Sequence, residues 1–167
     1  GRIVNIGADL ASTASSIALA EKYPFIYAAA GVHPSDAAQL NEHTFQWLCE
    51  QTAHEKVVAV GEIGLDYYWE KDPEVRANQR YWFRRQLNLA REKVLPVSIH
   101  SRDAAKDTLD IAKEERLAEI GGVVHCFSYT VEMAREYLNM GMYLGIGGVL
   151  TYKNARVLKE VVDYAPM

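Results

Sequence analysis

The chain has 167 residues, of which 49% are hydrophobic and 24% charged, a composition typical of a folded globular protein rather than a disordered one. Its net charge of −4 argues against a protein that coats duplex DNA along a basic stripe, so a nucleic-acid partner would be contacted locally. Two cysteines provide no disulfide framework, and no membrane-length apolar run or leader is apparent. These features together favour a cytoplasmic protein.

Six short apolar runs alternate with helical patterns along the chain. Continuous apolar runs of this length are expected for strands that are buried on both faces. Between the runs, apolar residues recur at helical spacing, as at Phe83, Leu87 and Ala90. This alternation predicts βαβ units, and therefore an α/β fold with a parallel sheet. The predicted strands are Ile3–Ile6, Phe25–Ala30, Val57–Gly61, Pro96–Ile99, Val123–His125 and Met142–Ile146.

Three of these runs end on a potential metal ligand, namely Glu62, His100 and His125. In a parallel α/β barrel all strands end on one face, where active sites lie, so the three side chains should converge. One carboxylate and two imidazoles suit one or two divalent ions with open coordination positions. Taken singly, each residue also has a structural interpretation: a glutamate that has left the strand for solvent, or a histidine satisfied by a backbone carbonyl.

Two further polar residues lie at predicted strand ends. His33 follows the second strand, and we interpret it as a substrate contact, with a simple turn histidine as the alternative. Arg102 ends the fourth run, and its planar guanidinium suits phosphate oxygens, although a solvated arginine is the alternative. Cys126 should face away from His125 on a strand, so we assign it to buried packing.

Five motifs appear in order along the chain and together resemble the TatD family of metal-dependent deoxyribonucleases, within the amidohydrolase-like barrels. They are Gly31-Val32-His33-Pro34, Gly61-Glu62-Ile63-Gly64-Leu65-Asp66-Tyr67, Pro96-Val97-Ser98-Ile99-His100-Ser101-Arg102, His125-Cys126-Phe127-Ser128 and Gly145–Thr151. The resemblance covers essentially all 167 residues. It implies a TIM-type barrel. It also implies that Glu62 is the catalytic carboxylate that bridges two metals, that His100 and His125 are ligands of one of them, and that His33 and Arg102 face the substrate phosphate.

The same resemblance implies an activity and its partners. The expected reaction is hydrolysis of DNA phosphodiesters, as a 3′-end exonuclease acting on single-stranded DNA or on a 3′ end. The expected cofactor is one or two divalent ions, Mg²⁺ first, with Mn²⁺ or Zn²⁺ as alternatives. Two other functions stay open: a related barrel metallohydrolase acting on C–N, ester or phosphotriester bonds, and a non-catalytic scaffold that retains the fold.

The chain departs from the family pattern in two respects. Tyr129 stands where the family usually has glycine, and we expect it to reshape the loop above the metals. The family's opening Asp-x-His-x-His strand and closing Glu-Thr-Asp strand are not found in the sequence. We therefore expect residues 1–167 to form a single, incomplete barrel domain with six of eight βα units, and expect this fragment to be inactive by itself.

Overall fold

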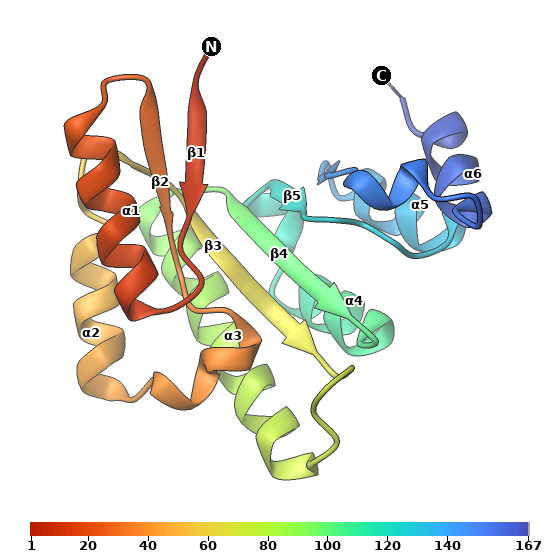
Figure 1. The fold of residues 1–167 in the computed structure, drawn as a ribbon. Helices are drawn as coiled ribbons and strands as arrows, with labels where there is room; N and C mark the ends of the chain where they lie inside the picture. Colours follow the sequence, from red (N-terminus) through yellow and green to blue (C-terminus); the bar gives the residue numbers. More distant parts are fainter. Residues whose placement is uncertain (167) are drawn as a thin grey trace.

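The computed structural model describes residues 1–166, and its framework is one parallel sheet of six strands. The strands are ordered as they occur in the chain, so each pairs with the next through a crossover. Figure 1 shows the sheet curving from β1 towards β5. The strands are β1 (Ile3–Ile6), β2 (Ile26–Ala30), β3 (Val57–Asp66), β4 (Val97–Arg102), β5 (Gly122–Val124) and β6 (Tyr143–Leu144).

Helices connect the successive strands, and α1, α2 and α3 lie along one face of the sheet (Figure 1). This arrangement confirms the predicted α/β class and an incomplete parallel barrel of the TIM type. No helix within residues 1–166 is both long and apolar enough to cross a membrane. The helices are α1 (Leu10–Lys22), α2 (Glu42–Gln51), α3 (Pro73–Lys93), α4 (Ala105–Glu114), α5 (Val131–Asn139) and α6 (Arg156–Tyr164), with 3₁₀ helices η1 (Pro34–Gln39), η2 (Leu117–Glu119) and η3 (Gly148–Thr151).

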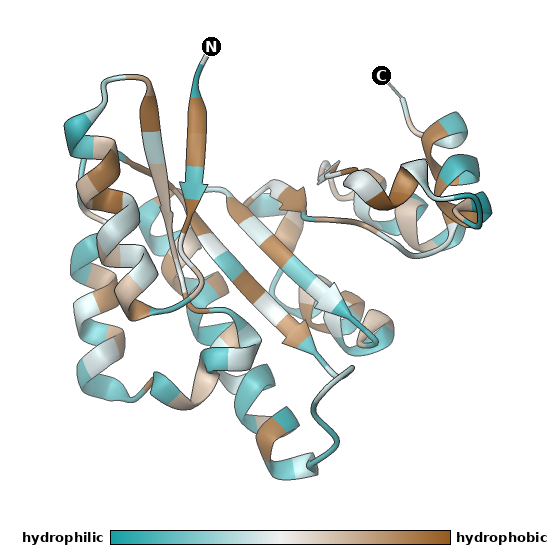
Figure 2. Ribbon diagram, in the orientation of Figure 1, coloured by the Kyte–Doolittle hydropathy of each residue, from teal (hydrophilic) through white to brown (hydrophobic). Residues whose placement is uncertain are grey.

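The core lies between the sheet and these helices. One apolar cluster joins β3, β4 and β5 to α3, α4 and α5, and a second joins β2 to α1, α2 and α3. Phe83, Leu87 and Ala90 are all buried, which confirms the predicted apolar stripe on α3. Figure 2 shows the corresponding pattern, with apolar colour concentrated on the strands and mixed colour on the helices. The apolar core therefore covers the face of the sheet that packs against the helices, and polar side chains can lie at the ends of the strands.

Two strands run further than the sequence predicted. β3 continues to Asp66 and β4 to Arg102, because their backbones keep pairing beyond the apolar runs, with Gly64 opposite His100 and Asp66 opposite Arg102. Glu62 and His100 therefore lie within strands, not just after them. The other bounds differ by small shifts. β5 begins one residue early and ends at Val124, and β6 is shortened to two residues because the following glycines lead into η3.

Gly64 lies where β3 closely approaches His100 of β4. Its φ of +144° lies in a region that residues with a Cβ rarely adopt. A Cβ placed there would also collide with the carbonyl oxygen of His100. The glycine is thus required for the pairing that sets His100 beside β3.

We predict that Gly64→Ala lowers the free energy of unfolding by about 3 kcal/mol, since backbone strain and overpacking add at this position. Urea denaturation with linear extrapolation measures the change. Gly148→Ala is the matched control, because a Cβ at Gly148 meets open space and should change stability little. Equal stability of the two variants would contradict the close approach described for Gly64.

Candidate metal centre

The carboxylate of Glu62 lies at the middle of the candidate centre. Its Oε1 is 2.9 Å from Nδ1 of His125 and 3.4 Å from Nδ1 of His100. The three side chains come from β3, from β4 and from the residue that follows β5, and Glu62 exposes only 16% of its side chain. The structure thus brings together the three residues predicted to converge, while their roles as ligands stay predictions.

Asp66 is a fourth member that the sequence analysis quoted in a motif but assigned no role. Its Oδ2 lies 3.0 Å from Nε2 of His100, and only 6% of its side chain is exposed. A proton on Nε2 that points at Asp66 leaves the Nδ1 lone pair of His100 directed towards Glu62. This is the usual way in which a carboxylate orients a metal-binding imidazole. The available signal was spacing, because the period of two places Glu62 and Asp66 on the same face of β3.

Two buried glutamines of α3 hold the backbone next to these residues. Gln79 accepts a hydrogen bond from the N–H of Asp66 at 3.0 Å and donates one to its carbonyl oxygen at 3.2 Å. Gln86 does the same for Val32, at 2.8 and 3.1 Å. Val32 directly precedes His33. One helix therefore fixes the strand ends from which both Asp66 and His33 project.

His33 completes the cluster, with its ring centroid 4.2 Å from that of His100. By distance alone His33, Glu62 and His100 form a candidate site for one ion, because a ligand atom from each lies within 4.8 Å of the others. However, the N–H of Ser35 donates to Nδ1 of His33 at 3.2 Å, so the neutral ring carries its proton on Nε2. An N–H donor suits a phosphate oxygen better than a cation, which supports the substrate-contact interpretation of His33.

Burial and neighbouring charges set the ionisation of these groups. Burial acts to raise the pKa of Glu62, but hydrogen bonds and charge interactions with His100 and His125 outweigh it and lower the pKa to about 2. Burial acts to lower the pKa of His100, but Glu62 and Asp66 outweigh it and raise the pKa. Burial and the nearby His100 both lower the pKa of His33, and together they outweigh the neighbouring carboxylates, which act to raise it. The centre thus combines an ionised carboxylate with imidazoles of differing proton affinity.

The loop after β5 corrects one expectation and clarifies another. Cys126 was assigned to buried packing but is exposed, because β5 ends at Val124 and the chain turns through a left-handed conformation at Cys126. Its Sγ lies 3.6 Å from Nε2 of His125. Tyr129 packs its ring on Phe127 and places its hydroxyl 2.9 Å from Oγ of Ser101. Tyr129 therefore ties this loop to β4, beside His100.

The donor set fits a divalent ion. It offers one carboxylate and two imidazoles, the mixed oxygen and nitrogen ligands that Zn²⁺, Mn²⁺ and related ions accept. A second carboxylate, Asp66, orients one of the imidazoles, as ligands of bound metals usually require. The partial exposure of the His125 side chain, at 41%, leaves an open side through which an exchangeable ligand or a substrate can approach.

Comparison with known proteins agrees with this geometry. The family model described as TatD related DNase matches residues 1–167. The chain belongs to this TatD-related family. An uncharacterized metal-dependent hydrolase, YabD of Bacillus subtilis (strain 168), is 47% identical over 165 residues, which are 99% of this chain and 64% of that protein.

Two solved structures are similar to the chain. The crystal structure of YjjV, a TatD homologue from Escherichia coli K12, has a TM-score of 0.91 at 34% identity and covers 99% of this chain and 64% of its own. A TatD-family hydrolase from Entamoeba histolytica has a TM-score of 0.83 at 29% identity and covers 99% and 57%.

The TatD-related chain thus spans less than two thirds of the length of these proteins. The matched residues include β3 with Glu62 and Asp66, β4 with His100, and His125 directly after β5. The relatives carry names of metal-dependent hydrolases, which is consistent with the donor set of the centre.

We predict that Asp66→Asn weakens Mn²⁺ binding about 10- to 100-fold, since the amide can no longer fix the Nε2 proton of His100 as a carboxylate does. Isothermal titration calorimetry gives the affinity, and circular dichroism checks that the fold is retained. Asp110→Asn is the control, because Asp110 pairs with Lys106 on an exposed helix face. An Asp66→Asn protein with unaltered affinity would show that Asp66 does not orient a ligand.

Metal binding should also weaken as the pH falls. The pKa of His100 is raised above its ordinary value of 6.5, so a metal must displace a proton from this ring below that raised pKa. Glu62, with a pKa of about 2, stays ionised throughout and contributes no such dependence near neutrality. We expect about a tenfold loss of Mn²⁺ affinity per pH unit below the pKa of His100. An affinity that is constant between pH 8 and pH 5 would exclude His100 as a ligand.

Proposed function

We propose that the protein that contains this chain is a metal-dependent hydrolase of DNA phosphodiester bonds, acting at a single-stranded or 3′ end. The observation that carries the proposal is one cluster in which an ionised carboxylate and the imidazoles of His33, His100 and His125 lie on or directly after successive strands, with Arg102 two residues after His100 on β4. Membership of a family described as TatD related DNase, with relatives named metal-dependent hydrolases, supports the same chemistry.

The residues of this chain divide into two groups by role. Glu62, His100 and His125 would hold one or two divalent ions, with Glu62 placed between the two imidazoles. Bound ions of this kind polarise a phosphoryl oxygen and lower the pKa of water. His33, with its proton on Nε2, and Arg102 would hold the phosphate oxygens. Asp66 keeps His100 in the tautomer that the centre requires.

The proposed cofactor is Mg²⁺, with Mn²⁺ or Zn²⁺ as alternatives. The carboxylate favours the harder ions Mg²⁺ and Mn²⁺, whereas the imidazoles favour Mn²⁺ and Zn²⁺. Mn²⁺ satisfies both preferences, which makes it the suitable ion for binding measurements in solution.

A related barrel hydrolase acting on phosphotriesters or lactones is the main rival. Such an activity would be supported by a lysine bridging the metals in carbamylated form. Among the described side chains that contact Glu62 or Asp66, none is a lysine. Within residues 1–166 Arg102 forms no ion pair, and its guanidinium lies over the ring of Tyr68. Its charge would therefore be available to an anionic diester, which distinguishes DNA from these neutral substrates.

The test is hydrolysis of oligonucleotides labelled at the 5′ or the 3′ end by the full-length protein, with Mg²⁺ or Mn²⁺ and with EDTA as the blank. We expect metal-dependent shortening from the 3′ end. We also predict that Glu62→Gln lowers kcat/KM by at least about 100-fold, since it removes the negative ligand while keeping the side-chain shape.

Glu50→Gln serves as the control, because Glu50 lies on the exposed face of α2, away from the centre. Turnover of a phosphotriester or lactone panel with intact DNA left uncut would refute the proposal in favour of the rival. Absence of any bound metal in the full-length protein would refute both and leave a non-catalytic scaffold.

A further inference from the structure

Two exposed aromatic side chains lie directly after the strand that carries the candidate centre. Tyr68 is 41% and Trp69 75% exposed, although large aromatic rings are usually well buried. Their rings meet edge to face with centroids 4.5 Å apart. Tyr68 is fixed to the centre itself, because its N–H donates to Oδ1 of Asp66 at 3.0 Å. The same Asp66 carboxylate therefore contacts His100 with one oxygen and anchors the aromatic pair with the other.

Arg102 brings a positive charge to this pair. Its guanidinium carbon lies 3.8 Å from the ring centroid of Tyr68 and 5.9 Å from that of Trp69. Arg102 also lies two residues after His100 on β4, so the period of two directs both to the same face. One face of Tyr68 is thus occupied by a cation, while three quarters of Trp69 stays exposed to solvent.

A hollow of about 160 Å³ adjoins Trp69, between the loop after β3 and η1. Pro34 and Ala37 contribute apolar surface from η1, and Asp66 lies at the border with the metal centre. Glu70 and Asn78 place a carboxylate and an amide in the lining. A negative carboxylate in the hollow disfavours a phosphate there, but it can accept hydrogen bonds from the amino groups of a nucleobase.

We propose that Trp69 and this hollow form a subsite for one unpaired nucleobase, whose phosphate is held by Arg102; the proposal rests on the proposed function and deepens it. Base stacking on an aromatic ring beside an arginine is how proteins bind single strands without reading sequence. A base inside a duplex is already stacked and paired, so it cannot reach Trp69 until the end frays. The subsite therefore selects single strands and unpaired ends over blunt duplexes.

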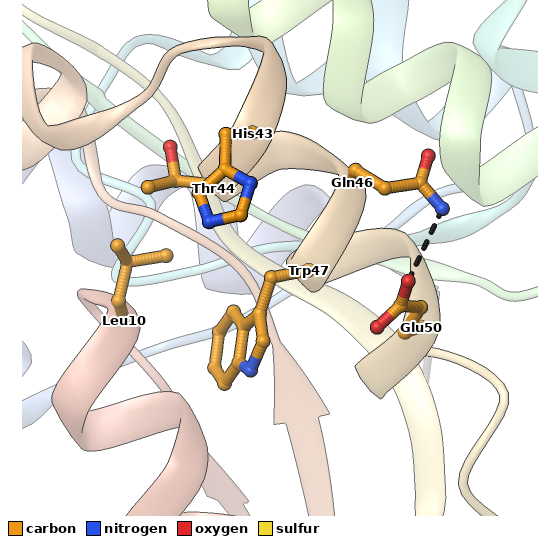
Figure 3. A pocket seen from close by; sticks show the side chains of 6 residues that line it. All are labelled: Leu10, His43, Thr44, Gln46, Trp47 and Glu50. Carbon is orange, nitrogen blue, oxygen red and sulfur yellow. Dashed lines mark hydrogen bonds between the residues drawn. The ribbon is translucent and has the colours of Figure 1, made fainter.

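A second tryptophan provides a matched comparison within the same chain. Trp47 on α2 lines another surface hollow together with Leu10 of α1, and Figure 3 shows the two side chains facing one another. There Glu50 accepts a hydrogen bond from Gln46 at 3.3 Å, and no arginine or lysine is among the residues that line the hollow. The lining of the hollow beside Trp69 contains no arginine or lysine either, so the difference lies at the rings. Arg102 lies 5.9 Å from the ring centroid of Trp69, whereas within residues 1–166 no cation lies over the ring of Trp47.

The experiment measures binding of a fluorescent single-stranded oligonucleotide to the full-length protein by anisotropy, in EDTA so that no strand is cut. A second oligonucleotide lacks only the base of its 3′-terminal nucleotide, and a third is paired into a blunt duplex. For the unaltered protein we expect the terminal base to improve affinity about tenfold, which is within the range for stacking on an aromatic ring. The duplex should bind like the abasic strand.

Trp69→Ala should bind the intact and the abasic strand equally weakly, while Trp69→Phe should keep most of the discrimination. Trp47→Phe should behave as the unaltered protein does. An unfolded variant would also bind both strands equally weakly, so circular dichroism must show that Trp69→Ala retains its fold. The proposal is overturned if Trp69→Ala still distinguishes the abasic strand tenfold, or if the unaltered protein does not distinguish it at all.

The same series separates this inference from the proposed nuclease activity. A protein that distinguishes the abasic strand through Trp69 but cuts no DNA with Mg²⁺ or Mn²⁺ would keep the base subsite and refute the phosphodiesterase proposal. A protein that cuts DNA but shows equal kcat/KM for single strands and blunt duplexes, with no effect of Trp69→Ala, would keep the nuclease and refute the subsite.

Discussion

Two glutamine side chains, buried in the apolar face of α3, hold the backbone next to the residues of the candidate metal centre. Gln79 and Gln86 are seven residues apart on α3, so they point in the same direction, and both are almost fully buried. Each satisfies the N–H and the C=O of one strand residue at once. Buried backbone groups without partners cost free energy comparable to a lost hydrogen bond, so these two contacts determine where β2 and β3 can end.

The same helix face explains why the arrangement is rigid. Phe83 and Leu87 lie between and beside the two glutamines and pack into the sheet. Packing fixes the distance from α3 to the strands, and the amides fix the register along them. His33 follows one of the clamped residues, and Asp66 is the other. The geometry of the centre is thus set from behind the sheet, by two glutamines that are not among the candidate metal ligands.

Sequence reasoning identified those features that depend on one segment at a time. Apolar runs predicted the six parallel strands, and the rule that strand ends share one face predicted that Glu62, His100 and His125 would meet. Asp66 and Gln79 were assigned no role. The period of two along β3 could have placed Asp66 on the face of Glu62, but its contact with His100 spans 34 residues and its contact with Gln79 spans 13, and no local pattern predicts such pairings. The burial assigned to Cys126 was wrong for a related reason. The alternation of a strand was applied to Cys126, two residues past Val124, where β5 ends.

The charge at the centre bears on how the proposed nuclease would bind an anionic polymer. Glu62 remains ionised with a pKa of about 2, and Asp66 is a second carboxylate within the same cluster. Without a cation these groups repel a phosphate, and the formal net charge of −4 adds to that repulsion. In the proposed nuclease, a divalent ion would offset this negative charge locally, beside His33 and Arg102. It would strengthen binding of the phosphate, so that a chain with a net charge of −4 could bind one end of a DNA strand.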